Sequence, residues 1–329
     1  MSSRLQSHLL AGNGLATPHD VVAHFGAMQA QDYLGALWAI GARMKSAVEA
    51  DVERAIDERR IVRCWPMRGT LHFVAAEDLR WLLDLLAPRV LARHRSRLEK
   101  EFSIDAKTLK RCRTLTGRAL RDGNALTRPE LYAIWEKAGI ATNASRGLHL
   151  LFALSHEQLI CFGARRGKQP TFVLLDEWVP RPVSKAGDLR ELGQRYLAGH
   201  GPATADDLAW WAGLTGKEAK EALAGEHSYR AARLPNVQLL PPFDEYTVAY
   251  RDRSSVVDPA FAKRVNAGGG MINAVLVIDG LVAGSWKRTI RGKAVHVAVT
   301  PFRELSEREQ RGVDRQVTRY AKFLGLEAR

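Results

Sequence analysis

Two glutamines one residue apart, Gln29 and Gln31, have the types and spacing to do chemistry, and they lie in MQAQDY between two apolar runs. Their carbonyl oxygens and NH2 groups together could hold a water molecule. Inside a helix the two side chains would point about 200° apart, whereas on extended backbone ahead of a helix they would share one face. The same amides could instead only satisfy the backbone of a turn, as buried polar groups usually do. Spacing alone leaves both interpretations open and favours the second.

Other candidates for catalysis are few. The adjacent acids Asp244 and Glu245 in PPFDEY suggest a general acid and base, but neighbouring strand positions face opposite ways, so we predict a structural role for them. His72 follows an expected hairpin turn and could either face the glutamines or pack in the core. The sequence contains no GxSxG, HExxH, Walker or strand-linked GxGxxG motif.

Basic charge is concentrated in one part of the chain. The formal net charge is +13, and residues 89–121 hold eleven basic and three acidic residues, a net charge of +8. A field of this sign favours polyanions, with nucleic acid first and an anionic membrane surface second, although a solvated basic surface is the simpler explanation of total charge. Local density of this kind is what phosphate neutralisation requires. We therefore expect residues 89–121 to contact nucleic acid.

Cysteine usage and the N-terminus indicate the compartment. Cys64, Cys112 and Cys161 lie far apart and form no CxxC pair, so neither a disulfide framework nor a zinc site is predicted. The start MSSRLQSHLLAGNG lacks a signal pattern, and no apolar run reaches about 18 residues. We expect a soluble cytoplasmic protein with no membrane segment.

The elements that must position these residues follow a repeated pattern. Three segments begin with a threonine, carry an acid three residues later and continue with an apolar helical period. The pairs are Thr17 with Asp20, Thr127 with Glu130, and Thr204 with Asp207. Each threonine can cap a helix while the acid reaches back to the cap amide, and Gly26, Gly139 and Gly213 can end these helices. The pattern predicts three related helical units.

A second helix is expected in each unit, capped by Asp32, Ser145 and Thr215. Paired strands follow the first two: residues 61–65 with 70–74 around the turn PMRG, and 158–162 with 171–175 around the basic loop GARRGKQP. The third unit has only the weaker YRAARL at 229–234. A helix, a turn, a helix and a hairpin make up the winged-helix arrangement. We therefore predict tandem winged helices.

The sequence changes in character after residue 236, where strand-length apolar stretches alternate with turns. Asp279-Gly280 between apolar runs predicts a tight hairpin, and residues 306–324 predict a closing helix. The predicted fold class is α+β, with three tandem winged helices and a small C-terminal β-barrel carrying a terminal helix. The predicted domains are residues 1–88, 89–180, 181–235 and 236–329, with a linker around Pro180, Pro182 and SKAG.

Five separated stretches now identify a family resemblance: MQAQDY, RCWPMRGTLHFV, GPATADDLAWWAGL, LLPPFDEYTVAYRDR and VLVIDGLVAGSWKR. In this order, over nearly the whole chain, they resemble the AlkZ/YcaQ winged-helix DNA glycosylases. The family's fold, three winged helices and a C-terminal β-barrel around a DNA-binding concavity, agrees with the repeats. The resemblance implies that Gln29 and Gln31 are catalytic. The Gln-x-Gln form looks like the AlkZ branch, whose type member acts on azinomycin adducts and interstrand crosslinks; the YcaQ branch has Asp at the second position.

The resemblance implies a monofunctional DNA repair glycosylase for cationic alkylated purines, with bulky adducts or crosslinks as further candidate substrates. It implies no cofactor, no metal and no lysine Schiff base. The expected partner is double-stranded DNA with alkylation damage, and we expect a monomer associated with the nucleoid. The residues expected to contact DNA are Arg63, Arg68 and His72 in the first wing; Arg93, Arg95, Arg97, Arg111 and Arg113 in the basic segment; and Arg165, Arg166 and Lys168 in the second wing.

Two other classes of protein fit the same elements. Winged helices often serve transcriptional regulators, so a non-catalytic DNA-binding protein is the alternative. It predicts sequence-specific binding without activity on alkylated DNA. A protein-interaction scaffold is the third class, and it would leave the basic segment without a purpose.

Overall fold

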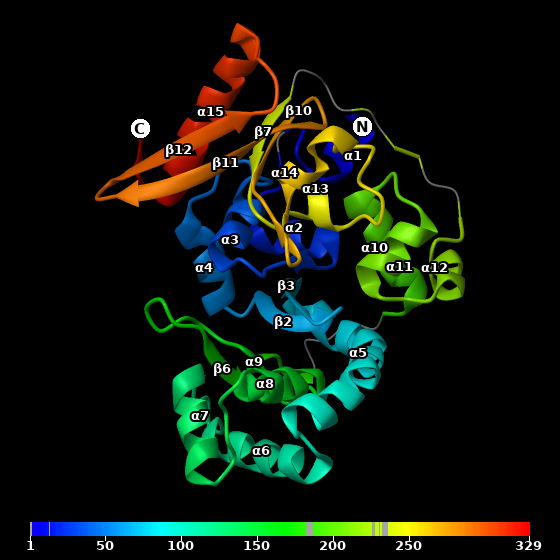
Figure 1. Cartoon of the computed structure of the whole chain (residues 1–329), viewed down its shortest axis with the longest axis vertical. Coiled ribbons are helices and arrows are strands. Elements are labelled where there is room, and N and C mark those ends of the chain that lie inside the picture. Colours follow the sequence, from blue (N-terminus) through cyan, green and yellow to red (C-terminus); the bar gives the residue numbers. More distant parts are fainter. Residues whose placement is uncertain (1, 13, 182–186, 226–227, 230, 232–235) are drawn as a thin grey trace. The chain divides into compact units, whose positions relative to one another are not determined.

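A computed structural model describes residues 2–12, 14–181, 187–225, 228–229, 231 and 236–329 (Figure 1). The chain divides into two compact units of mixed α and β structure. Unit 1 comprises Met1–Ala55 and Leu189–Arg329, and unit 2 comprises Ile56–Asp188. The fold class is therefore α+β, as predicted, while the finer division into four domains stays a prediction.

Unit 1 begins and continues with short helices. Their bounds are α1 Ser2–Ser7, α2 Pro18–Phe25, α3 Tyr33–Gly41, α4 Glu49–Asp57 (which runs into unit 2), α10 Leu189–His200, α11 Ala205–Ala212 and α12 Gly216–Ala222. A two-residue strand, β1 Met28–Gln29, lies between α2 and α3. The sequence pattern did not predict α4, which separates α3 from the following hairpin.

The C-terminal part of unit 1 is a curled sheet with a long helix. Its five strands are ordered β13 Glu327–Ala328, β12 Ala294–Pro301, β11 Leu281–Arg291, β10 Val275–Ile278 and β7 Val237–Leu240. All pair antiparallel except β12 with β13. The Asp279-Gly280 turn joins β10 to β11 with φ of 53° and 91°, which confirms the predicted tight hairpin. Short elements complete this part: α13 Glu245–Val248, a 3-10 turn Pro259–Phe261, α14 Ala262–Val265, β8 Asn266–Gly268 and β9 Met271–Ile272.

Helix α15, Glu307–Leu324, packs on this sheet and on α3 (Figure 1). A Cβ at Gly312 would lie 2.5 Å from Val237 Cγ2, and one at Gly41 would lie 2.4 Å from the Phe323 ring. The two glycines thus allow close approach of α15 to β7 and to α3. The predicted closing helix is confirmed, with Ser306 as its N-cap.

Unit 2 holds two hairpins and its own core. Its elements are β2 Ile61–Met67, β3 Thr70–Ala75, a 3-10 turn Ala76–Asp78, α5 Leu79–Phe102, α6 Ala106–Ala119, β4 Leu126–Thr127, α7 Arg128–Lys137, α8 Arg146–His156, β5 Ile160–Phe162, β6 Thr171–Leu174 and α9 Leu175–Trp178. Strands β2 and β3 pair antiparallel, and the second sheet has the order β4-β6-β5. Both predicted hairpins are therefore present. Trp135, Leu150 and Phe172 belong to the apolar core of this unit.

Threonine caps start the three repeated helices, as predicted. Thr17 Oγ1 accepts the Asp20 N–H at 3.1 Å, and Thr17 has extended backbone. Full capping boxes start α7 and α11: Thr127 with Glu130, and Thr204 with Asp207. These local rules therefore set the starts of α2, α7 and α11.

The caps of the second helices are confirmed in two cases out of three. Asp32 caps α3, and Thr215 forms a capping box with Glu218 at α12. Ser145 precedes α8 but makes no side-chain cap, which corrects the prediction. Its φ of 67° is left-handed, whereas a capping hydroxyl needs extended backbone to reach the first amides of the helix.

Two predictions fall largely outside the described residues: the weak strand pair in YRAARL and the linker at Pro182 and SKAG. In the part of the chain that is described, no helix is long and apolar enough to cross a bilayer.

Candidate active site

The glutamine pair lies at the entry to α3 rather than inside a helix. Gln29 ends β1 and is 9% exposed, while Gln31 lies in the following bend and is exposed. Ala30 between them is fully buried. The pair is therefore placed where the sequence pattern predicted, on non-helical backbone just before a helix N-terminus, which carries a partial positive charge.

Asp32 fixes the start of α3 directly after the pair. Its Oδ1 accepts the Gly35 N–H at 2.6 Å, with extended backbone at φ −90° and ψ 108°. A Cβ at Gly35 would lie 2.9 Å from Asp32 Oδ1 and 3.2 Å from Pro241 Cβ. Glycine is therefore needed for the PPFDEY segment to approach this helix.

The PPFDEY segment supplies the main polar support of the pair. We expected Asp244 and Glu245 on a strand, but β7 ends at Leu240, because Pro241 and Pro242 have no N–H for a ladder. Asp244 instead caps α13 by accepting the Tyr246 N–H at 2.9 Å. The two acids consequently make different contacts.

Glu245 is 1% exposed, and both of its carboxylate oxygens accept hydrogen bonds. Its Oε1 accepts the main-chain N–H of Gln29 at 2.6 Å. Its Oε2 faces Trp211 Nε1 at 2.9 Å and His200 Nε2 at 3.1 Å. Sequence reasoning assigned Glu245 a structural role and missed this link to Gln29, because no local pattern joins residues so far apart in the chain.

Two buried tyrosines and a buried histidine pack in the cluster around His200. Burial raises the pKa of Tyr196 and Tyr250 well above its usual value, so both phenols stay protonated. Burial lowers the pKa of His8 well below its usual value, with His200 and Arg43 adding to the effect, so His8 stays neutral.

A pocket of about 310 Å³ opens beside Asp32 in unit 1. Its wall includes Trp286, Lys287 and Arg288 from β11 together with Pro242. The sequence analysis did not select Lys287 and Arg288, which line this pocket. Two consecutive cations after a tryptophan, in SWKR, were the sequence feature that could have indicated them.

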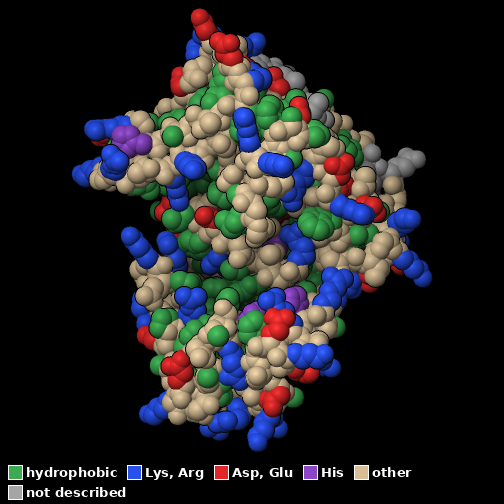
Figure 2. All heavy atoms as spheres, viewed as in Figure 1, with side chains coloured by type: hydrophobic (Ala, Val, Ile, Leu, Met, Phe, Trp, Pro, Cys, Tyr) green, Lys and Arg blue, Asp and Glu red, His purple; other side chains and the backbone are tan. Residues whose placement is uncertain are grey.

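The basic segment predicted to contact DNA forms α5 and α6 in unit 2. Figure 2 shows Lys and Arg side chains over much of the visible face of this unit, interspersed with acidic ones. The exposed members of the predicted set are Arg93, Arg95, Arg97, Arg111, Arg113, Arg166 and Lys168, with Arg165 half-buried. This surface is thus available to phosphates.

Part of that charge is already paired within unit 2. Arg97 Nε lies 2.9 Å from Glu101, Arg113 Nη1 lies 3.1 Å from Glu157, and Arg166 Nη1 lies 2.7 Å from Glu130. Hydrogen bonds from Thr127 and the Arg166 pair lower the pKa of Glu130, so this acid stays charged. Arg111 donates to the Ala138 carbonyl at 2.7 Å. The arginines predicted to contact DNA therefore differ in how far neighbouring groups already neutralise or bind their guanidinium.

The β2–β3 hairpin, predicted to be the first wing, carries three less accessible side chains. Arg68 forms the β2–β3 turn with Gly69, at φ 53° and 76°. Arg63 is buried with its guanidinium 5.0 Å from the Phe162 ring centre, and His72 is fully buried with Nδ1 3.0 Å from the Thr70 carbonyl oxygen. Contact of these three residues with DNA stays a prediction.

Comparisons with known proteins agree over nearly the whole chain. The family model described as "DNA glycosylase AlkZ-like" matches residues 22–323. An "interstrand DNA cross-link repair glycosylase" of Streptomyces sahachiroi is 25% identical over 364 residues, covering 98% of this chain and 95% of that protein. The solved structure of Streptomyces sahachiroi DNA glycosylase AlkZ is similar in fold, with a TM-score of 0.78 and 22% identity, covering 100% of this chain and 97% of that chain.

Proposed function

This chain belongs to the AlkZ-like DNA glycosylase family, and from that premise we propose that it excises cationic alkylated purines with Gln29 and Gln31 as its catalytic pair. Family membership makes it a DNA repair enzyme, a hydrolase of N-glycosyl bonds. The lesion class and the catalytic residues are our proposal. Bulky adducts and interstrand crosslinks are candidate substrates, since the Streptomyces sahachiroi relative is named for crosslink repair.

The chemistry of a cationic purine explains why two amides would suffice. Alkylation of a ring nitrogen leaves the base positively charged, so its glycosidic bond is weakened and the departing base needs no proton. The transition state places oxocarbenium-like charge on the sugar. Amide carbonyls can orient a water and turn their negative dipole ends toward that charge, whereas a neutral amide is a poor general base.

The proposal rests on the hydrogen bonds that hold the backbone around the two glutamines. The backbone of Gln29 is bonded to a buried carboxylate at 2.6 Å, and Asp32 caps the helix that follows Gln31. Such support is what a preorganised site requires. A pair that merely satisfied a turn would not need a buried acid drawn from the C-terminal part of the chain.

The finer architecture follows from the repeated elements. We infer that α7, α8 and the β5–β6 hairpin form one winged helix, and that the N-terminal and α11–α12 elements are parts of two others. The curled sheet would be the barrel-like domain. The exposed cations of α5, α6 and residues 165–168 would hold phosphates of double-stranded DNA, which position an enzyme without reading sequence. Lys287 and Arg288 would hold a phosphate close to the lesion.

Release of base from alkylated DNA tests the proposal. The purified protein is incubated with duplex DNA containing 7-methylguanine, and free base and abasic sites are measured. We expect release by the wild type and a loss of about a hundredfold or more in Gln29→Ala and Gln31→Ala. No release by the wild type on any cationic purine would reject the lesion class, and full activity of both variants would reject the catalytic pair.

A further inference from the structure

We propose that Glu245 is a positioning residue for the glutamine pair, a role that rests on the function proposed above. Its carboxylate accepts the Gln29 main-chain N–H at 2.6 Å, and the contact joins residues 216 apart in the chain. A charge-assisted hydrogen bond of this length is short and strong. Glu245 would act through the backbone of Gln29, which places both glutamine side chains, rather than by touching the substrate.

The carboxylate is itself held from the opposite side. Trp211 on α11 and His200 at the end of α10 both contact Oε2, and His200 Nδ1 lies 3.1 Å from the Tyr196 carbonyl oxygen. Trp211 and His200 are both fully buried. Helices α10 and α11 therefore supply the clamp that fixes Glu245.

This geometry explains why an acid is needed here. A carboxylate accepts on both oxygens, so it can satisfy the Gln29 amide and the Trp211 indole at once. Glutamine has nearly the same shape, but its NH2 group would face one of these two donors and leave that donor without an acceptor. The Gln29 backbone or the clamp must then shift, and a misplacement of about 1 Å can lower a rate by about a hundredfold.

Single-turnover excision with Glu245→Gln tests the role. We expect the rate at saturating enzyme to fall by about tenfold to a hundredfold, while the half-saturating enzyme concentration stays within about twofold of the wild type. A double-mutant cycle with Gln29→Ala is the specific readout. If Glu245 acts through the Gln29 backbone, Glu245→Gln should lower the rate by a smaller factor in the Gln29→Ala background, where only the placement of Gln31 is left to lose.

Tyr246→Phe is the matched control, because it removes the neighbouring buried hydrogen bond to the Gly280 carbonyl without touching Gln29. It should lower the melting temperature and leave the excision rate unchanged. An unchanged rate in Glu245→Gln, or losses that add fully to those of Gln29→Ala, would overturn the positioning role. Inactivity of the wild type would instead point to failure of the proposed function.

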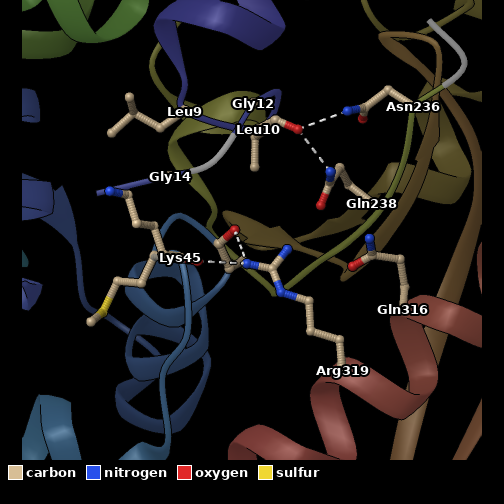
Figure 3. Close-up of a pocket in the computed structure, with 11 residues that line it drawn as sticks. Leu9, Leu10, Gly12, Gly14, Lys45, Asn236, Gln238, Gln316 and Arg319 are labelled. Carbon is tan, nitrogen blue, oxygen red and sulfur yellow. Dashed lines mark hydrogen bonds between the residues drawn. The ribbon is translucent and has the colours of Figure 1, made fainter. Parts of the chain in front are cut away.

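A separate pocket of about 550 Å³ lies in unit 1 beyond the C-terminal end of α3 (Figure 3). Asn236 and Gln238 line it and both donate to the Leu10 carbonyl oxygen, at 2.7 and 2.8 Å. Arg319 on α15 donates to the Ala42 and Met44 carbonyl oxygens at 2.8 and 3.0 Å. These side chains of the wall therefore bind other parts of unit 1.

Discussion

Arg43 and Asp244 form a bidentate ion pair with no exposed surface on either side chain. Arg43 Nη1 donates to Oδ2 at 2.8 Å and Nη2 donates to Oδ1 at 2.7 Å. Arg43 also donates to the His8 and Ala39 carbonyls at 3.0 and 2.8 Å. The pair thus ties the PPFDEY segment to the end of α3, while Glu245 ties the same segment to Gln29, ahead of the start of α3.

Breaking this pair should destabilise the fold. Asp244→Asn leaves the Arg43 charge buried without its counter-ion, so we expect the free energy of unfolding to fall by about 3–5 kcal/mol. Urea denaturation measures the loss. The exposed pair of Arg251 with Asp206, at 2.8 Å, is the control, and Asp206→Asn should cost about 0–1 kcal/mol. Equal losses in the two variants would mean that burial adds nothing to the Arg43–Asp244 pair.

Loss of the Asp32 cap at the start of α3 should lower both the stability of the protein and its excision rate. Asp32→Ala removes the acceptor of the Gly35 N–H, and we expect a loss of about 1 kcal/mol in stability together with slower excision, because the first turn of α3 frays beside Gln31. Asp32→Asn should retain the wild-type stability and excision rate, since asparagine caps equally well.

Thr215→Ala provides the comparison for Asp32→Ala. Thr215 caps α12 through the Glu218 N–H at 3.3 Å, away from the glutamines in the sequence and outside the basic segment 89–121. This variant should lower the melting temperature and leave the excision rate at the wild-type value. A matching loss of activity would show that general destabilisation, rather than the cap at α3, limits excision.

Local rules allowed much of the fold to be predicted. Thr127 and Thr204 start helices because their side chains and the acids three residues later satisfy the first amides, and Asp279-Gly280 turns because both residues accept positive φ. Ser145 does not cap α8 with its side chain, because the tight turn before this helix imposes left-handed backbone on it. Helix α4 was not predicted.

Contacts between distant residues were not predictable. The bond from Gln29 to Glu245 spans 216 residues, and no periodicity relates its two ends. The glutamines could be selected from the sequence, but the contact of Glu245 with the Gln29 backbone could not. Similarly, the basic residues of α5 and α6 could be counted, but the pairing of Arg113 with Glu157 depends on packing between α6 and the end of α8.

This difference in pairing predicts different contributions to DNA binding. The logarithm of the association constant for undamaged duplex should fall steeply with the logarithm of salt concentration. Arg95→Gln and Lys168→Gln, which replace exposed cations, should each flatten that slope by about 0.9 if each contacts one phosphate. Arg97→Gln should flatten it less, because Glu101 already neutralises Arg97 in part. Salt titration by fluorescence anisotropy measures the slopes, and unchanged slopes in the first two variants would argue against these contacts.

Acid should destabilise unit 2 through His156, a residue outside the candidate active site. Burial lowers the pKa of His156 to about 4, below its usual value of 6.5, and the Phe152 carbonyl oxygen 2.8 Å from Nδ1 only partly opposes this. The unfolded chain therefore binds this proton at higher pH than the folded chain, so stability is full above pH 6.5 and declines as the pH falls toward 4. Between pH 7 and pH 5 the decline should be about 2 kcal/mol for this group.

His156→Phe isolates that contribution, because it keeps a ring against Phe152 and removes the titrating group. We expect urea unfolding of the wild type to lose about 2 kcal/mol more between pH 7 and pH 5 than unfolding of the variant does. Other groups titrate equally in both proteins, so the difference between the two pH profiles reports on His156 alone. Parallel profiles would mean that His156 accepts its proton as readily in the folded chain as in the unfolded one.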